Sequence, residues 1–176
     1  MLETLISSRT RIKLLLKFFL NSKATSYLRG LENEFGDSTN AIRLELNRFE
    51  KAGMLLSYSK GNKKYFRANT DHPLYRDTHN LLLKYIGFDK IIDTIVDNLG
   101  ELRKVFVTGA FAEGLDAPVI ELVFIGTINK AYLAELVEKV SKHISRKVQY
   151  VAYTEDEFVS SGWEMDNPQS LLLWES

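Results

Sequence analysis

Residues 38–53 have the sequence STNAIRLELNRFEKAG, which carries more structural information than any other segment of the chain. Ile42, Leu46 and Phe49 follow one another at spacings of four and three, so they share one face of a helix. A serine stands at the start of the segment and a glycine at its end, both favoured residues at helix boundaries. The segment therefore predicts a helix over residues 39–52 whose apolar stripe packs against a core.

The opposite face of this helix carries side chains that suit contacts with DNA. Arginine can bond the O6 and N7 atoms of guanine, and asparagine can bond the N6 and N7 atoms of adenine. Free backbone N–H groups at a helix start attract phosphates, and the first residues of a recognition helix enter the major groove. The predicted base contacts are Asn40, Arg43 and Asn47, and the predicted phosphate contacts on this helix are Ser38, Thr39 and Lys51.

The segments on either side of this helix complete a known order of elements. Helices are predicted over residues 9–21 and 27–35, with a short extended segment over 24–26 between them. Two β-prone runs on either side of a Gly-Asn pair predict a hairpin over 55–67. Helix, short strand, helix, helix and hairpin is the order of a winged helix-turn-helix. The hairpin, or wing, adds three predicted phosphate contacts, Lys60, Lys63 and Lys64.

Charge is distributed unevenly along the chain, although 23 basic and 23 acidic residues balance overall. Residues 1–70 hold 13 Lys and Arg against 6 Asp and Glu, a net charge of +7. Residues 71–176 hold 10 against 17, a net charge of −7. A basic half joined to an acidic half is typical of a polyanion-binding module fused to another domain. The pattern supports double-stranded DNA as the partner of the first half.

Composition excludes several kinds of site. The chain has no cysteine, which removes disulfides, thiolate catalysis and cysteine zinc sites. Its three histidines do not form a pair at metal-binding spacing, so neither a metal nor a cofactor is predicted. No apolar run approaches the ~18 residues that span a bilayer, and no signal peptide is recognised at the N-terminus. We therefore expect a cytoplasmic protein that has no membrane partner.

The rest of the chain has an α/β pattern. His72-Pro73 marks a boundary, and helices are predicted over 73–86 and 88–99, the second ended by Gly100. Strands over 102–108, 119–125 and 147–153, with a helix over 129–144, follow. The expected fold class is α+β / α/β, with a winged helix over residues 1–71, a helical connector over 72–99 and an α/β domain over 100–176.

Two apolar segments allow alternative interpretations. The tail with Trp163, 171–173 and Trp174 either closes the core as a terminal strand or forms a dimer contact. The helix pair of the connector is more apolar than a linker needs. It either packs against one of the domains or forms a dimer seam.

Three motifs of the first half resemble the arsenic-repressor-like winged-helix family. They are RIKLL at 11–15, AIRLELNRFEKAGML at 41–55 and GNKKYF at 61–66, and the resemblance covers roughly residues 8–70. Members of that family bind operator DNA as dimers. The resemblance implies a homodimeric transcriptional regulator, most simply a repressor.

The second half resembles the minimal nucleotidyltransferase fold, in VTGAFAEG at 107–114 and VIELVFIG at 119–126. In that family a Gly-Ser pair holds the triphosphate, and two carboxylates one residue apart bind two divalent metals. Here Ala110 stands in place of the serine and Val119 in place of the first acid, while Glu121 remains. One carboxylate does not hold two Mg²⁺ ions. We therefore predict a degenerate domain that is not an enzyme and that receives a small-molecule or protein effector.

The predicted function is regulation of transcription through double-stranded DNA, bound by helix 39–52 and the wing at 55–67. Two alternatives remain open. In the first alternative, the protein is a nucleotidyltransferase or a nucleotide-binding, antitoxin-like protein, and binding of ATP with Mg²⁺ would favour it. In the second alternative, the winged helix contacts another protein, and weak, salt-insensitive DNA binding would favour it.

Overall fold

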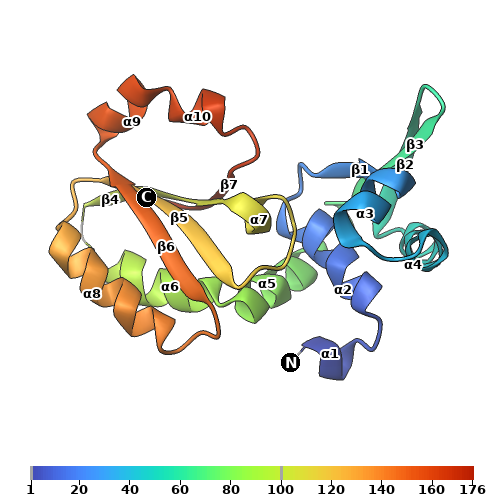
Figure 1. The fold of residues 1–176 in the computed structure, drawn as a ribbon, viewed down its shortest axis with the longest axis horizontal. Coiled ribbons are helices and arrows are strands. Elements are labelled where there is room, and N and C mark those ends of the chain that lie inside the picture. Colours follow the sequence, from blue (N-terminus) through green and yellow to red (C-terminus); the bar gives the residue numbers. More distant parts are fainter. Residues whose placement is uncertain (1, 100) are drawn as a thin grey trace. The chain divides into compact units, whose positions relative to one another are not determined.

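The computed structural model describes residues 2–99 and 101–176. The chain divides into two compact units, the first ending at Tyr85 and the second running from Ile86 to Ser176 (Figure 1). Each unit has its own sheet and its own helices, so the predicted α+β class is confirmed. Gly100, the predicted end of a helix, lies outside the described residues.

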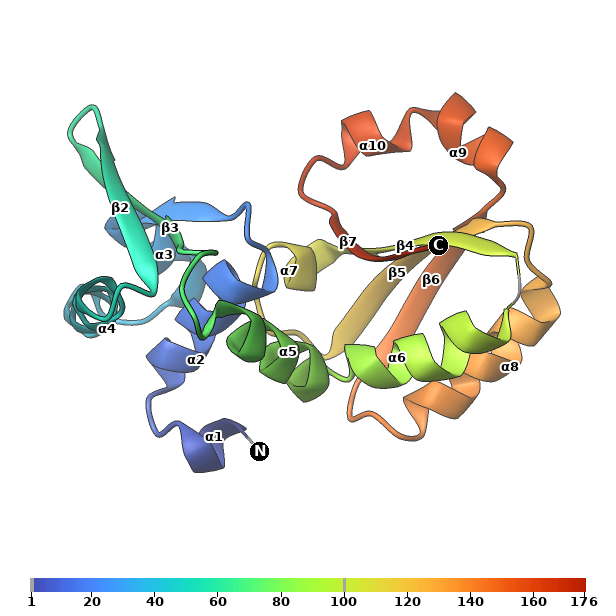
Figure 2. The same ribbon diagram turned by 180° about the vertical axis from the view of Figure 1, so that it is seen from behind.

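The first unit contains five α-helices, one π-helical turn and a three-stranded sheet among its described residues. The sheet has the order β1-β3-β2, and both strand pairs are antiparallel. Strands β2 and β3 form a hairpin that extends beyond α3 and α4 (Figure 2). The elements are α1 (Leu2–Leu5), α2 (Arg9–Leu15), η1 (Leu16–Leu20), β1 (Thr25–Tyr27), α3 (Leu28–Phe35), α4 (Thr39–Lys51), β2 (Leu55–Lys60), β3 (Lys63–Ala68) and α5 (Tyr75–Ile86).

Helix α4 forms because its sequence fits both a helix and the core beneath it. The Ser38 hydroxyl accepts a hydrogen bond from the Ala41 N–H at 3.2 Å and so caps the helix start. Ile42, Leu46 and Phe49 are buried, as their spacing predicts. The predicted helix over 9–21 differs, because α2 ends at Leu15 and continues as the π-helical turn η1, in which every side chain is buried.

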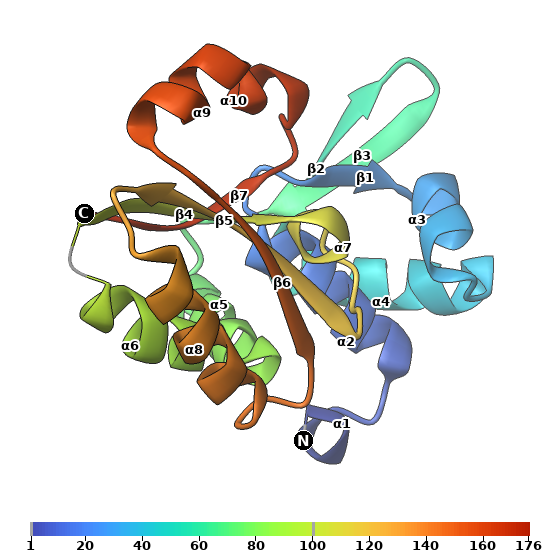
Figure 3. The ribbon, with the colours of Figure 1, turned by 60° about the vertical axis from the view of Figure 1, so that its left-hand side comes forward.

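The second unit is a four-stranded sheet with helices on both faces. The strand order is β6-β5-β4-β7, in which β5 and β6 are parallel and the other two pairs are antiparallel. Helices α6 and α8 cover one face, and α9 and α10 lie over the other (Figure 3). The elements are α6 (Phe88–Ile95), η2 (Val96–Asn98), β4 (Leu102–Thr108), α7 (Gly109–Ala112), β5 (Val119–Gly126), α8 (Lys130–Ser141), β6 (Lys147–Tyr153), α9 (Glu155–Ser161), α10 (Trp163–Asp166) and β7 (Leu171–Glu175).

A cluster of aromatic and aliphatic side chains fixes α9 to the sheet. Phe158 of α9 stacks on Phe106 of β4, with ring centroids 5.9 Å apart, and Trp163 packs on both rings. Val123 and Ile125 of β5 complete this cluster. Residues 171–174 of the apolar tail lie in β7, which pairs antiparallel with β4 as a terminal strand, whereas Trp163 begins α10.

The predicted three-part organisation differs from the two compact units. The sequence predicts a separate connector over residues 72–99, whereas α5 up to Tyr85 belongs with the first unit and α6 with the second. The apolar face of α6 explains the difference, because Phe88, Ile91 and Ile95 are fully buried beneath the second sheet and α8. Within residues 2–99 and 101–176, every helix is too short or too polar to cross a bilayer.

Candidate nucleic-acid interface

Helix α4 presents a polar face on the side away from the core. Asn40, Arg43, Asn47 and Lys51 are all exposed, and the apolar stripe of the same helix is buried. This arrangement follows from the helical period, because residues three or four positions apart share one face of a helix and the residues between them lie on other faces. The Ser38 hydroxyl is already used by the helix cap, whereas the exposed amides and guanidinium are available to a ligand.

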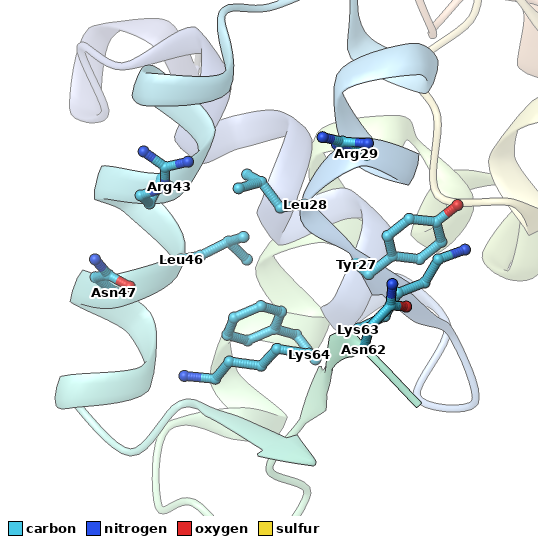
Figure 4. A pocket seen from close by; sticks show the side chains of 10 residues that line it. Tyr27, Leu28, Arg29, Arg43, Leu46, Asn47, Asn62, Lys63 and Lys64 are labelled. Carbon is cyan, nitrogen blue, oxygen red and sulfur yellow. The ribbon is translucent and has the colours of Figure 1, made fainter. Parts of the chain in front are cut away.

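A concave pocket of about 510 Å³ lies between α4, the start of α3 and the wing. Figure 4 shows Arg43, Leu46 and Asn47 on α4, with Tyr27 and Lys63 across the pocket from them. Four cationic side chains and two amides line it, and no carboxylate does. The lining residues are Tyr27, Leu28, Arg29, Arg43, Leu46, Asn47, Asn62, Lys63, Lys64 and Phe66.

The pocket brings together some of the predicted contact residues and not others. Four of them line it: Arg43, Asn47, Lys63 and Lys64. Five lie outside its lining: Ser38, Thr39, Asn40, Lys51 and Lys60. The roles of all nine residues in DNA binding stay predictions.

The lining residues that the sequence did not predict as contacts include Tyr27 and Arg29. Tyr27 ends β1 and faces Tyr65 of β3, with ring centroids 5.3 Å apart. The Lys63 ammonium lies 4.2 Å from the centroid of the Tyr27 ring, a cation–π contact. Arg29 is exposed on the first turn of α3. The helix predicted from the sequence begins at Tyr27, whereas α3 begins at Leu28 and Tyr27 belongs to β1. Assigning Tyr27 to the strand would have predicted that it lies beside the wing.

Lys64 is held differently from its neighbour Lys63. Its ammonium lies 2.8 Å from the Glu50 carboxylate of α4, which also accepts a hydrogen bond from the Ser57 hydroxyl of β2. The hydrogen bonds from Lys64 and Ser57 hold the pKa of Glu50 below its usual value of 4.5, against a smaller effect of burial. Glu50 thus links α4 to both strands of the wing, and Lys64 is already paired with an anion.

Glu45 fixes the back of α4 to α2. Its carboxylate accepts hydrogen bonds from Arg11 Nε at 2.8 Å and Arg11 Nη2 at 3.2 Å, and from Arg48 Nη1 at 2.8 Å. Burial raises the pKa of this carboxyl. The hydrogen bonds and charge of Arg11, with the charge of Arg48, outweigh that effect, so the pKa lies below 4.5. Glu45 therefore orients the helix without touching the pocket.

In the second unit, the residues of the nucleotidyltransferase resemblance meet at the end of β4. Thr108 pairs with Glu121 across β4 and β5, and Gly109 follows in the left-handed region, with a φ of 62°. A Cβ at Gly109 would lie 2.6 Å from a Glu121 carboxylate oxygen, so only glycine leaves room for that side chain. A small pocket of about 220 Å³ next to this turn is lined by Thr108, Gly109, Glu113 and Asp166, among others.

Among the residues that the structure describes, no three His, Cys, Asp or Glu side chains lie close enough together to hold a metal ion. Glu121 is exposed, and strand alternation puts it on the same face of the sheet as Val123 and Ile125, against which Phe158 of α9 packs. Val119, at the position of the first family carboxylate, is half-buried.

No protein-family model matches the sequence, and no curated protein is significantly similar to it. Solved structures with a similar fold include a tri-AMPylated Shewanella oneidensis HEPN toxin in complex with MNT antitoxin, at 18% identity, 53% of this chain, 73% of that chain and a TM-score of 0.40. A candidate nucleotidyltransferase from Sulfolobus solfataricus is 21% identical over 55% of this chain and 82% of its own, with a TM-score of 0.35. Reduced HlyU from Vibrio cholerae is 13% identical over 48% of this chain and 83% of its own, with a TM-score of 0.38.

These matches contradict the prediction that the chain is not an enzyme. They include a candidate nucleotidyltransferase and a complex of an AMPylated toxin with its MNT antitoxin. The prediction rested on a single surviving carboxylate in the second unit. The exclusion of catalysis is therefore withdrawn. The nucleotidyltransferase-like part of the resemblance agrees with these folds, whereas the arsenic-repressor-like part is not confirmed by them.

Proposed function

We propose that the first unit binds double-stranded DNA in the pocket between α4 and the wing, and that the protein acts as a transcriptional regulator. One observation carries the proposal. The pocket lining combines four cations with two amides and contains no carboxylate. Such a surface attracts a phosphate backbone and can bond base edges at the same time.

Different residues of the pocket would contact the bases and the phosphates of DNA. Arg43 and Asn47, on the exposed face of α4, would contact base edges when α4 lies in the major groove. Arg29 and Lys63, on the other side of the pocket, would contact phosphates. Lys64 contributes less, because it is already paired with Glu50.

We further propose a homodimer, as the family resemblance implies. The first unit leaves several leucines exposed, which a partner copy could cover. Leu5, Leu74 and Leu81 are the exposed leucines of this unit that lie outside α4 and the wing. A dimer would read two half-sites about one helical turn apart.

The test is fluorescence anisotropy with the DNA just upstream of the gene, compared with scrambled DNA over a salt series. Arg43→Ala should reduce the preference for one base by about 1–3 kcal/mol. Lys63→Ala should weaken binding to all sequences and lower the salt slope by about one unit. Lys90→Ala, an exposed cation of α6 in the second unit, is the matched control and should change neither quantity.

Equal losses on all sequences after Arg43→Ala would show that this residue does not contact bases. Weak binding of the unaltered protein that does not respond to salt would contradict DNA binding altogether. That result would favour a winged helix that contacts another protein.

A second candidate function concerns the second unit, which would bind a nucleoside triphosphate with Mg²⁺. The observation in its favour is the Thr108-Gly109 turn beside the exposed Glu121 and the adjoining pocket. We expect titration calorimetry with ATP and Mg²⁺ to give a saturable heat that Glu121→Gln abolishes. Incubation with radiolabelled ATP and a cell extract would then test for transfer of the label to protein. The absence of heat with every nucleoside triphosphate would contradict this candidate.

A further inference from the structure

The sheet of the first unit has an outer face that the helices of that unit leave exposed. Along β2 and β3, alternate residues such as Leu55, Phe66 and Ala68 are buried, and the residues between them point the other way. We name the outward set the tyrosine face. It consists of Tyr27, Leu56, Tyr58, Lys60, Lys63, Tyr65 and Arg67.

The tyrosine face has the composition of an interaction surface. Tyr27, Tyr65 and Tyr58 lie in register across the three strands, with ring centroids 5.3 Å and 5.6 Å apart. Leu56 and Tyr58 are 40% and 42% exposed. Tyrosine and arginine are enriched in protein interfaces, where their large side chains contribute much of the binding energy.

Charge on this face has one sign. The three strands contain Lys60, Lys63 and Arg67 on the outward side and no aspartate or glutamate on either side. A shallow depression of about 580 Å³, lined in part by Leu56, Tyr58 and Arg67, lies on the same face. A suitable partner would therefore present apolar side chains surrounded by carboxylates.

The second unit of the same chain presents such a surface. Residues 154–167, TEDEFVSSGWEMDN, contain five carboxylates and no basic residue, and they form α9 and α10. We name them the acidic segment. Met165 and Val159 are 89% and 79% exposed, the highest values among the large apolar side chains described. Phe158 is buried against the sheet, so the segment offers these side chains from a fixed support.

We propose that the acidic segment of one copy of this protein docks on the tyrosine face of a second copy. The apolar side chains of each surface would meet, and the carboxylates would surround the cations of the wing. Every copy carries both surfaces, and its net charge is zero, so long-range repulsion does not oppose the approach of two copies. The contact is heterologous, because different patches of the two copies meet.

The contact has a consequence for DNA binding, and this consequence alone rests on the proposed function. Lys63 belongs to both the tyrosine face and the pocket beside α4. One copy could not offer this cation to a phosphate and to the acidic segment of another copy at once. Docking and DNA binding would therefore compete.

Sedimentation velocity of the full chain tests the contact, over about 50 to about 500 mM salt, where screening of exposed charges becomes strong. The unaltered protein should form species larger than the proposed homodimer at low salt, and these should dissociate as salt rises, whereas a dimer held by apolar contacts should persist. Arg67→Glu on the wing and the double variant Asp156→Lys/Glu164→Lys on the acidic segment should each weaken association about tenfold or more. An equimolar mixture of the two variants should restore association, because opposite charges then meet again.

Controls separate this contact from general effects of charge. Lys90→Glu on α6 and Glu138→Lys on α8 reverse exposed charges elsewhere and should leave association unchanged. Circular dichroism would verify that each variant is folded. A sedimentation coefficient that does not change with salt would overturn the proposal, as would salt-dependent association that both wing and segment variants leave intact.

The design also separates this proposal from the proposed function. Arg43→Ala lies outside the tyrosine face, so it should impair DNA recognition and leave association unchanged. If association follows the charge reversals while no DNA binds, docking holds and the proposed function fails. If DNA binds without displacing the second copy, the competition through Lys63 is refuted.

Discussion

The buried carboxylate of Glu45 provides the sharpest test of how α4 is held. It is 5% exposed and accepts two hydrogen bonds from Arg11 of α2 and one from Arg48 of its own helix. Glu45→Gln keeps the volume of the side chain and removes the charge. The two arginines would then lose their anionic partner, and the amide nitrogen would face donors instead of accepting from them.

The size of the effect follows from burial. Breaking a fully buried ion pair costs about 3–5 kcal/mol. The side chains of Arg11 and Arg48 are 36% and 63% exposed, so water compensates both for part of the loss. We expect the free energy of unfolding of the first unit to fall by about 1–3 kcal/mol, with a fall of roughly 4–8 °C in Tm for each kcal/mol in a domain of this size.

The two tryptophans of the chain make the assay specific. Trp163 and Trp174 both lie in the second unit, so tryptophan fluorescence follows that unit alone, whereas far-ultraviolet circular dichroism follows both. Glu45→Gln should shift the urea midpoint seen by circular dichroism and leave the fluorescence midpoint unchanged. Glu138→Gln, at an exposed ion pair of α8, is the control and should shift neither.

The same residue predicts an acid sensitivity. Because the pKa of Glu45 is lowered in the folded protein, its contribution to stability is complete above its ordinary pKa of 4.5. The contribution is lost as the pH falls through the lowered value. Glu45→Gln should therefore remove part of the acid destabilisation of the first unit. An unchanged midpoint at neutral pH, or an unchanged acid profile, would refute the role of this ion-pair cluster.

Three further substitutions have defined outcomes. Glu50→Gln should loosen the wing by breaking its pair with Lys64, and anisotropy should show weaker DNA binding at every sequence with unchanged base preference. Gly109→Ala should destabilise the second unit by about 1–2 kcal/mol in fluorescence-monitored urea unfolding, because its φ of 62° is costly for alanine and the new Cβ meets the Glu121 carboxylate. Phe158→Ala should lower the stability of the same unit by about 3–5 kcal/mol, since it removes a buried ring that stacks on Phe106. A smaller loss than that of Gly109→Ala would show that α9 is not anchored by this ring.

Periodicity predicted α4 and its two faces because local sequence determines both. Ile42, Leu46 and Phe49 could share a buried face only in a helix, and Arg43 and Asn47 then had to be exposed. Strands β4, β5 and β6 and helices α6 and α8 of the second unit followed from the same reasoning. The partner of β7 did not, because its pairing with β4 joins residues about 70 positions apart, and no local pattern specifies such a neighbour.

The orientations of Lys63 and Lys64 in the wing could have been predicted from the sequence but were not. Lys63 and Lys64 are adjacent in a strand, so they must point to opposite faces, and only one of them could belong to the outer face. The structure places Lys63 over Tyr27 and Lys64 against Glu50. Strand alternation could have separated the two lysines. The choice of Glu50 as the partner of Lys64 required knowing how the hairpin folds back on α4.

The two proposals together set how DNA binding should depend on protein concentration. Both contacts use Lys63 and both weaken with salt, so salt alone does not separate them. Docking of one copy on another is second order in protein, whereas binding of one copy to a DNA site is first order. At a fixed concentration of DNA sites, added protein should first raise occupancy and then raise it less than a simple isotherm predicts. Arg67→Glu, which weakens docking but lies outside the pocket beside α4, should bring binding closer to the simple isotherm. An isotherm that already follows simple binding in the unaltered protein, at concentrations where it self-associates, would show that a docked copy still binds DNA.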